Sequence, residues 1–166
     1  MRRITVLVAG LGLLLGGCGG PGPPPSPPAG PASTLPAAPD PVPPDPGWEG
    51  TTELDFATGE LTAPGFNELI DAQAPDWATD PLTTVSVLLR LDRADGQVEA
   101  DVQGGGSDPM VVVTNSQLAD DSVAAIRYRI TLTEGSDGRY RFAAGEATWR
   151  CQPERGQQDF GTDVCL

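Results

Sequence analysis

The sequence contains no histidine and no lysine, and all ten of its basic residues are arginine. Without histidine the commonest general base is missing, and so is a frequent ligand of zinc. The chain also has neither the G-x-S-x-G motif of serine hydrolases nor a phosphate-binding P-loop. These absences favour a protein that is not an enzyme and that carries no metal and no cofactor.

Positive charge is also scarce. The 23 acidic residues outnumber the ten arginines, and the formal charge is -13. An acidic surface opposes the binding of nucleic acid, which depends on neutralising phosphates. It also gives no attraction to anionic lipid headgroups, so contact with a membrane requires a separate anchor.

The first eighteen residues have the layout of a bacterial export signal. Arg2 and Arg3 precede an apolar run over residues 4–15, which is shorter than the about 20 residues of a membrane-spanning helix. The tetrad Leu15-Gly16-Gly17-Cys18 resembles the lipobox of bacterial lipoproteins. The resemblance implies that residues 1–17 are a signal peptide and that Cys18 carries the lipid that holds the exported protein on the outer face of the cell membrane. An ordinary signal peptide cleaved elsewhere is the alternative.

Cysteine is rare, and its three copies are Cys18, Cys151 and Cys165. An odd number of thiols in an exported protein requires an explanation, and lipidation of Cys18 supplies one. The remaining two cysteines lie in a compartment that is oxidising enough to keep a disulfide. The sequence therefore predicts a bond between Cys151 and Cys165 that closes a short C-terminal loop.

Proline is concentrated in one segment. Residues 19–47 hold 13 of the 18 prolines, and they lack the apolar residues that a folded core needs. We expect residues 18–47 to form a lipidated, disordered linker that could span roughly 90 Å at about 3.1 Å per residue. Such a linker is a spacer or, alternatively, a ligand of proline-binding modules. Residues 48–166 have the composition of a single folded domain.

Two helices are predicted in the first part of this domain. The first is indicated by apolar residues at helical spacing, which are Phe66, Leu69, Ile70 and Ala74. Pro64 fits its first turn and Pro75 ends it. A second helix is predicted over residues 81–91, because Asp80-Pro81 is a good helix start and Leu82, Val85, Leu88 and Leu89 keep helical spacing. The β-branched residues among 83–85 also favour a strand.

The rest of the domain alternates between apolar and polar residues, as strands do. After a short strand over residues 52–56 and the two helices, about four strands are predicted, near residues 98–102, 110–114, 126–132 and 140–149. Residues 134–138 read as a hairpin loop. Helices followed by an antiparallel meander make an α+β fold, and this order of elements resembles the cystatin-like and nuclear-transport-factor-like folds.

The C-terminal segment resembles the ending of a family of uncharacterised bacterial lipoproteins. Its sequence from Trp149 to Phe160 is WRCQPERGQQDF, and Cys165 closes it. The same family is similar in two earlier stretches, Phe66-Asn67…Leu69-Ile70-Asp71 and Trp77-Ala78…Asp80-Pro81. Members often have histidine at the position of Gln157, so the glutamine here weakens any catalytic or metal-binding role for this segment. The resemblance carries no activity with it.

Four arginines are expected on the polar face of one hairpin: Arg127, Arg129, Arg139 and Arg141. Forked guanidinium donors suit an anionic cell-wall polymer, a headgroup or an acidic partner protein. The alternative is that they form ordinary ion pairs with Glu99 and Asp101 on a neighbouring strand.

The remaining polar groups have simpler explanations. Asp120 and Asp121 are a candidate pair of catalytic carboxylates, but a turn or cap before Ser122 explains them as well. The acidic residues between 92 and 101 do not have the spacing of a calcium-binding EF-hand, and a solvated turn at Asp95-Gly96 accounts for them.

The disulfide loop, which carries Arg155, Asp159 and Phe160, has two interpretations. It can present side chains to a partner, or it can act as a clasp in which Phe160 and Trp149 fill the edge of the core.

The function expected from these features is that of a non-catalytic binding or interaction module on a proline-rich stalk. Its partner would be an envelope protein or an anionic wall polymer. A carrier of small ligands is the alternative, with a pocket on the curved sheet lined by residues from the set Phe66, Tyr128, Tyr140, Phe142 and Trp149. A carboxylate-dependent hydrolase is the second alternative.

Overall fold

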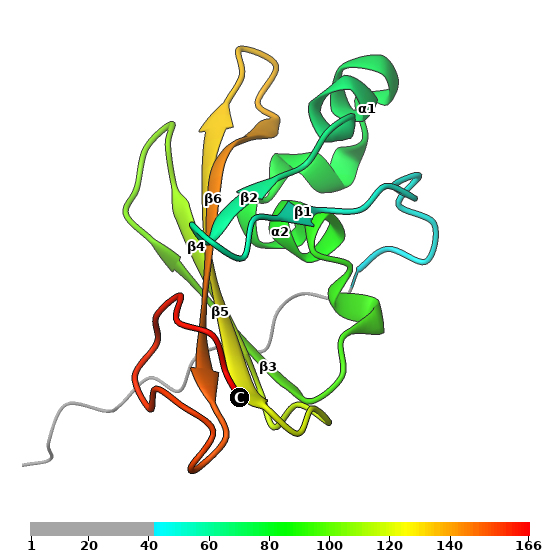
Figure 1. Cartoon of the computed structure of the whole chain (residues 1–166). Coiled ribbons are helices and arrows are strands. Elements are labelled where there is room, and N and C mark those ends of the chain that lie inside the picture. The colour runs from blue at the N-terminus through cyan, green and yellow to red at the C-terminus, as the bar shows by residue number, and fades with distance from the viewer. Residues whose placement is uncertain (1–41) are drawn as a thin grey trace, which may run out of the picture. The chain divides into compact units, whose positions relative to one another are not determined.

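A six-stranded antiparallel sheet with helices packed on one face forms the domain (Figure 1). The computed structural model describes residues 42–166. The predicted α+β class is therefore confirmed. The signal peptide, Cys18 and the linker up to residue 41 lie outside the described residues.

The strands follow the order β1-β2-β6-β5-β4-β3 across the sheet. Their bounds are Glu53–Leu54 for β1, Glu60–Thr62 for β2, Gln97–Gln103 for β3, Met110–Ser116 for β4, Val123–Glu134 for β5 and Tyr140–Cys151 for β6. The four longest strands agree with the predicted ones. β2 was not predicted, because a single apolar residue between two polar ones gives no detectable alternation.

The first helix, α1, spans Phe66–Gln73 and is shorter than its apolar pattern predicts. Gly65 and Ala74 flank it with left-handed backbone, at φ values of 85° and 46°. Pro64 therefore precedes the helix rather than lying in its first turn. Ala74 is an exposed C-cap rather than part of the buried face, because the chain reverses there to reach Pro75.

The second helix, α2, spans Pro81–Leu88, so the choice of helix over strand is confirmed there. The carboxylate of Asp80 caps it by accepting the backbone N–H of Thr83 at 2.7 Å. Five successive residues, 84–88, are buried, so this helix is enclosed on several sides. The hydroxyls of Thr84 and Ser86 donate to carbonyl oxygens one turn earlier, which satisfies both polar groups inside the core.

Two short 3₁₀ segments extend the helical layer, η1 over Asp76–Thr79 and η2 over Leu91–Arg93. The core lies between this layer and the sheet, and Phe66 is completely buried in it. The ring of Trp48 meets Phe66 edge-on, with 5.0 Å between ring centroids.

The packed part of the domain also extends further toward the N-terminus than expected. Residues 42–47, which the composition assigned to the linker, lie against the helical layer. Val42 packs on the core, and the carbonyl oxygen of Pro46 accepts the indole N–H of Trp77 at 3.2 Å. Residues that precede Trp48, the expected first residue of the domain, therefore already contact the domain.

Asn67 completes the edge of the sheet next to α1. Its side-chain amide donates to the carbonyl oxygen of Phe142 and accepts the N–H of the same residue, both at 2.9 Å. β2 pairs with β6 only at Gly145 and Glu146, so the backbone of Phe142 lies on an edge that no strand covers within the described residues. The amide of Asn67 supplies the donor and acceptor that a neighbouring strand would supply.

Replacing Asn67 by alanine is expected to lower the free energy of unfolding by about 2 kcal/mol, because one partly buried donor and one acceptor lose their partners. Urea denaturation of both proteins measures this difference. Glu68→Ala, on the exposed side of the same helix, is the control and should cost little. Equal losses for the two variants would show that Asn67 contributes only helix propensity.

Candidate functional site

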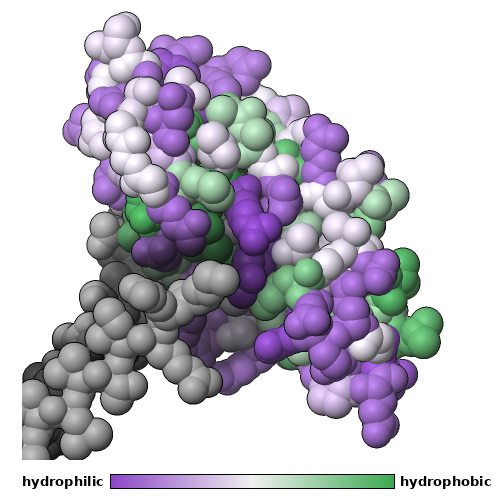
Figure 2. Space-filling model, turned by 90° about the vertical axis from the view of Figure 1, so that its left-hand side faces the viewer, coloured by the Kyte–Doolittle hydropathy of each residue, from purple (hydrophilic) through white to green (hydrophobic). Residues whose placement is uncertain are grey.

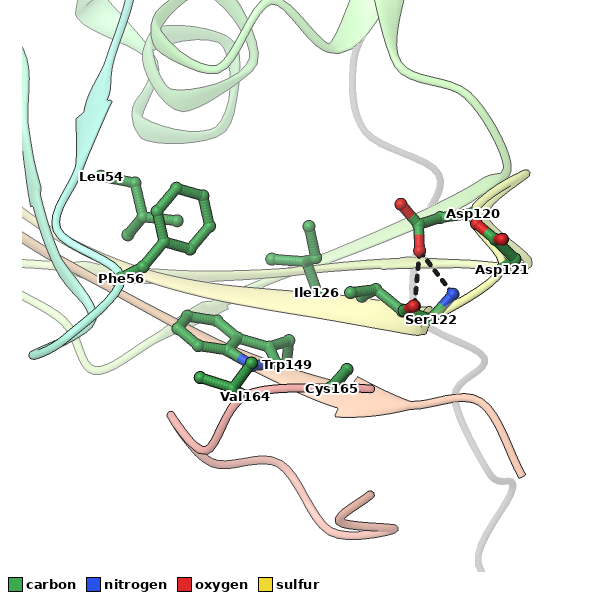
Figure 3. Close-up of a pocket in the computed structure, with 10 residues that line it drawn as sticks. Leu54, Phe56, Asp120, Asp121, Ser122, Ile126, Trp149, Val164 and Cys165 are labelled. Atoms are coloured by element: carbon green, nitrogen blue, oxygen red, sulfur yellow. Dashed lines mark hydrogen bonds between the residues drawn. The ribbon is translucent and has the colours of Figure 1, made fainter. Parts of the chain in front are cut away.

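An apolar groove of about 330 Å³ lies on the sheet between the β1–β2 turn, the β4–β5 loop and the C-terminal loop (Figure 3). Its apolar lining comes from four separate segments and consists of Leu54, Phe56, Val123, Ile126, Trp149 and Val164. None of the described residues that line it belongs to a helix. The groove is therefore a part of the sheet face that the helical layer leaves open.

Ile126 and Trp149 form the floor of the groove, since they pair directly across β5 and β6. The indole N–H of Trp149 donates to the carbonyl oxygen of Asp163 at 2.7 Å, which satisfies the polar end of this side chain. Phe56 packs against the indole with 5.8 Å between ring centroids. The remaining surface that Trp149 presents is apolar.

The rim of the groove exposes large hydrophobic side chains to solvent. Phe56 is 70% exposed and Val164 is 80% exposed, and both line the groove. Leu166 is also exposed, and its carbonyl oxygen accepts the hydroxyl of Ser122, which lines the groove too. Exposed apolar side chains that gather around one hollow mark a surface suited to binding.

Two carboxylates, Asp120 and Asp121, stand at one end of the groove (Figure 3). One oxygen of Asp120 accepts the backbone N–H groups of Val123 and Ser122, at 2.6 and 2.7 Å. These hydrogen bonds, that of Val123 first, lower the pKa of Asp120 below its usual value. The turn that the sequence suggested for this pair is confirmed, and the carboxylate of Asp120 remains ionised at neutral pH.

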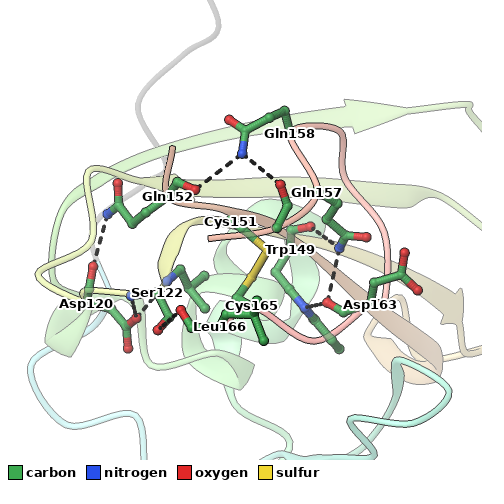
Figure 4. Close-up of a disulfide and its surroundings, with 12 residues drawn as sticks. Asp120, Ser122, Trp149, Cys151, Gln152, Gln157, Gln158, Asp163, Cys165 and Leu166 are labelled. Carbon is green, nitrogen blue, oxygen red and sulfur yellow. Dashed lines mark hydrogen bonds between the residues drawn. A yellow bond between two sulfur atoms is a disulfide. The ribbon is translucent and has the colours of Figure 1, made fainter. Parts of the chain in front are cut away.

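The C-terminal loop forms one wall of the groove, and the predicted disulfide between Cys151 and Cys165 is confirmed (Figure 4). Backbone hydrogen bonds join Trp149 to Gly161 in both directions, at 2.9 and 3.0 Å. The side chain of Gln157 donates to the carbonyl oxygen of Trp149 at 3.0 Å. The loop is thus fastened to β6 as a clasp, and Gln157 has a structural role within it.

The clasp interpretation expected Phe160 to fill the edge of the core together with Trp149, but Phe160 does not lie there. It lies under the guanidinium of Arg127, 3.8 Å from the ring centroid, with Arg150 at 5.6 Å. Arg127 and Arg150 each follow a floor residue in the strand, and successive side chains of a strand point to opposite faces. Phe160 therefore covers the outer face of the sheet, behind the groove.

The four arginines that were expected on the polar face of one hairpin lie in two different surroundings. Arg129 pairs with Glu146 at 2.9 Å and Arg127 lies over Phe160. At the other end of the hairpin, the arginines contact the helical layer and the hairpin loop. Arg141 forms ion pairs with Asp71 and Asp137, and Arg139 donates to the carbonyl oxygen of Pro75. A register irregularity between Thr131 and Leu132 separates the two pairs.

The ion pairs of these arginines also differ from the expected ones. Within residues 42–166 no ion pair joins any of the four to Glu99 or Asp101. The hydrogen bond from Arg141 lowers the pKa of Asp137 to about 2. The positive charge of Arg141 is therefore paired with the carboxylates of Asp71 and Asp137.

The core leaves little room for the internal pocket that the carrier hypothesis requires. Phe66 is completely buried, and Tyr128, Tyr140 and Phe142 pack against the core. Of the five side chains named for that pocket, Trp149 lines the open groove. The contributions of Phe56, Ile126 and Val164 were missed, although the position of Val164 beside a disulfide cysteine was a usable signal.

The acidic segment that was compared with a calcium loop has local partners. Asp92 makes two hydrogen bonds with the guanidinium of Arg90, at 2.9 and 3.0 Å. In the described part of the chain no group of three or more acidic or cysteine side chains is arranged to hold a metal ion. No helix there is long and apolar enough to cross a membrane.

No family model matches this chain, and no curated protein or solved structure matches it either. The structure defines an α+β domain with an open apolar groove that ends at two carboxylates.

Proposed function

We propose that this chain is an exported, lipid-anchored lipoprotein of the cell envelope that binds a ligand in the groove over Ile126 and Trp149 without catalysing a reaction. The lipobox at Leu15–Cys18 supports the anchor. The proline-rich residues 19–41 support a spacer that holds the binding domain away from the membrane.

The groove is the single observation that carries this proposal. Its volume of about 330 Å³ lies at the lower end of the range for ligand pockets, about 300–1,000 Å³. Its rim exposes Phe56 and Val164, and covering apolar surface is favourable by roughly 25 cal/mol per Å². On the side of the molecule away from the helices, hydrophilic side chains predominate and hydrophobic ones form only small groups (Figure 2).

We also infer that the fold is related in shape to cystatin-like and nuclear-transport-factor-like folds, in which helices pack on a curved antiparallel sheet. The order of α1 and α2 before the four long strands supports it. In this chain the ligand site is an open groove at one end of the sheet rather than a chamber under the helices.

The non-catalytic assignment is supported by the surroundings of the acidic pair. Asp120 holds the turn that starts β5, through two backbone hydrogen bonds. The absence of histidine and lysine leaves few side chains to act as a general base at neutral pH.

The groove is tested with 2-phenylethanol, a neutral probe with one aromatic ring, by ligand-observed NMR. The protein is the full chain purified from membranes into lipid nanodiscs, and empty nanodiscs serve as the blank. We expect saturable binding that Phe56→Ala weakens by about threefold or more, since aromatic contacts contribute about 0.5–1.5 kcal/mol.

Val102→Ala is the matched control, because Val102 is also an exposed hydrophobic side chain but lies on β3, outside the groove. This variant should bind the probe like the unmodified protein. Binding that is not saturable, or that both variants weaken equally, would refute the groove as the ligand site.

A further inference from the structure

The two ends of the groove differ in chemistry. Leu54 and Phe56 form an apolar end, and Asp120 and Asp121 form an acidic one, with Ile126 and Trp149 between them (Figure 3). A ligand that fills the groove therefore meets apolar side chains at one end and along the floor, and negative charge at the other end.

Within residues 42–166 no arginine forms an ion pair with Asp120 or Asp121. No arginine lines the groove. The arginines of residues 42–166 that form ion pairs do so elsewhere, since Arg90 and Arg93 pair with Glu49 and Asp92, and the hairpin arginines have the partners described above. Arg127 and Arg150 stack on Phe160 behind the sheet.

The carboxylates also retain free acceptor capacity. Both hydrogen bonds to Asp120 use its Oδ1 atom, and within residues 42–166 no hydrogen bond reaches its Oδ2 atom. The carboxylate of Asp121 has no hydrogen-bond partner in the same part of the chain, and the residue is exposed. An ionised carboxylate accepts up to about four hydrogen bonds, so this end can receive a charged donor.

We propose that the groove binds a small organic cation, in which an apolar and preferably aromatic group lies against Trp149 and Ile126 and a protonated amine faces Asp120 and Asp121. This inference rests on the proposed function of the groove and names the class of its ligand.

Charge makes the other ligand classes of similar size less favourable. An anion would meet two carboxylates and the field of a chain with a formal charge of -13. A neutral ligand would cover the acidic end without replacing the water that it removes, which is unfavourable. A second copy of this chain would bring the same excess of negative charge.

Three probes with the same phenyl group separate the charge effect from the apolar effect: 2-phenylethylamine, 2-phenylethanol and phenylacetate. The full chain in nanodiscs is titrated with each by ligand-observed NMR, and empty nanodiscs are subtracted. We expect the amine to bind about fivefold more tightly than the alcohol, as for a partly exposed ion pair, and phenylacetate to bind most weakly. The preference for the amine should fall as salt increases.

The double variant Asp120→Asn and Asp121→Asn identifies the groups responsible. Asparagine keeps the oxygen that accepts the turn's N–H groups, so the loop should persist. We expect this variant to bind the amine and the alcohol equally while keeping its affinity for the alcohol. The control, Glu99→Gln with Asp101→Asn, removes the same charge from exposed residues of β3 and should keep the preference.

The possible failures are distinguishable. Equal affinity of the unmodified protein for the amine and the alcohol would overturn the cation inference and leave the groove as a binding site. Loss of the preference in the control variant would overturn it as well, because net charge rather than the groove would then be responsible. If no probe binds, both the inference and the proposed function fail.

Discussion

Replacing Cys151 and Cys165 together by serine is expected to lower the free energy of unfolding by about 3 kcal/mol, and the Tm by about 10 °C. The two cysteines are 14 residues apart, and the bond between them restricts the unfolded chain. Cys151 is also buried at the end of β6, where a serine hydroxyl would have to find a hydrogen-bond partner. Thermal unfolding of the oxidised protein and the variant measures the difference.

The same substitution should disturb the groove, because Val164 and Cys165 line it. Val164→Ala separates the two effects, since it trims the wall and leaves the disulfide in place. We expect this control to weaken the binding of 2-phenylethanol at an almost unchanged Tm. A loss of stability below about 1 kcal/mol in the double serine variant would mean that hydrogen bonds such as that of Gln157 to Trp149 hold the loop by themselves.

Replacing Cys18 by serine is expected to move nearly all of the protein from the membrane fraction to the soluble fraction. Two acyl chains suffice for stable anchoring, and serine cannot carry the thioether-linked lipid. Removing Arg2 and Arg3 with the signal peptide changes the formal charge from -13 to -15, so the body itself is repelled by anionic lipid. Cell fractionation and partitioning into detergent measure the shift, and mass spectrometry identifies the N-terminus of each form.

Cys165→Ser is the control for this experiment, because it removes a cysteine without affecting the lipobox. That variant should stay in the membrane fraction. A Cys18→Ser protein that is correctly processed and still partitions into detergent would contradict the lipid anchor.

The parts of the fold that the sequence determined by itself are those set by short-range patterns. Alternation identified the four long strands β3 to β6, and the 3.6-residue period with an Asp-Pro start identified α2. The pairing of Cys151 with Cys165 followed from counting, since the predicted lipidation of Cys18 leaves only one pair. Each of these features depends on residues close in the chain or on the total number of one residue type.

The site was predicted only in fragments. Trp149 was named as a pocket residue and Asp120 as a turn former, but nothing in the sequence placed them in one groove. Leu54 and Phe56 reach the groove because β2 pairs with β6, and Val164 reaches it because the disulfide returns the C-terminus to the end of the sheet. A short strand such as β2 leaves no periodic signal, so its pairing could not be predicted.

Tertiary structure alone decided which polar side chains have hydrogen-bond or ion-pair partners, and which part of the sheet surface the helices leave uncovered. Asn67 meets Phe142 across 75 residues of sequence, and Arg141 meets Asp71 across 70. Alternation tells which side chains share a face of the sheet, but not how far along that face the helices extend. The helical layer ends before Ile126 and Trp149, and this packing boundary turns two ordinary inward-facing residues into the floor of a groove.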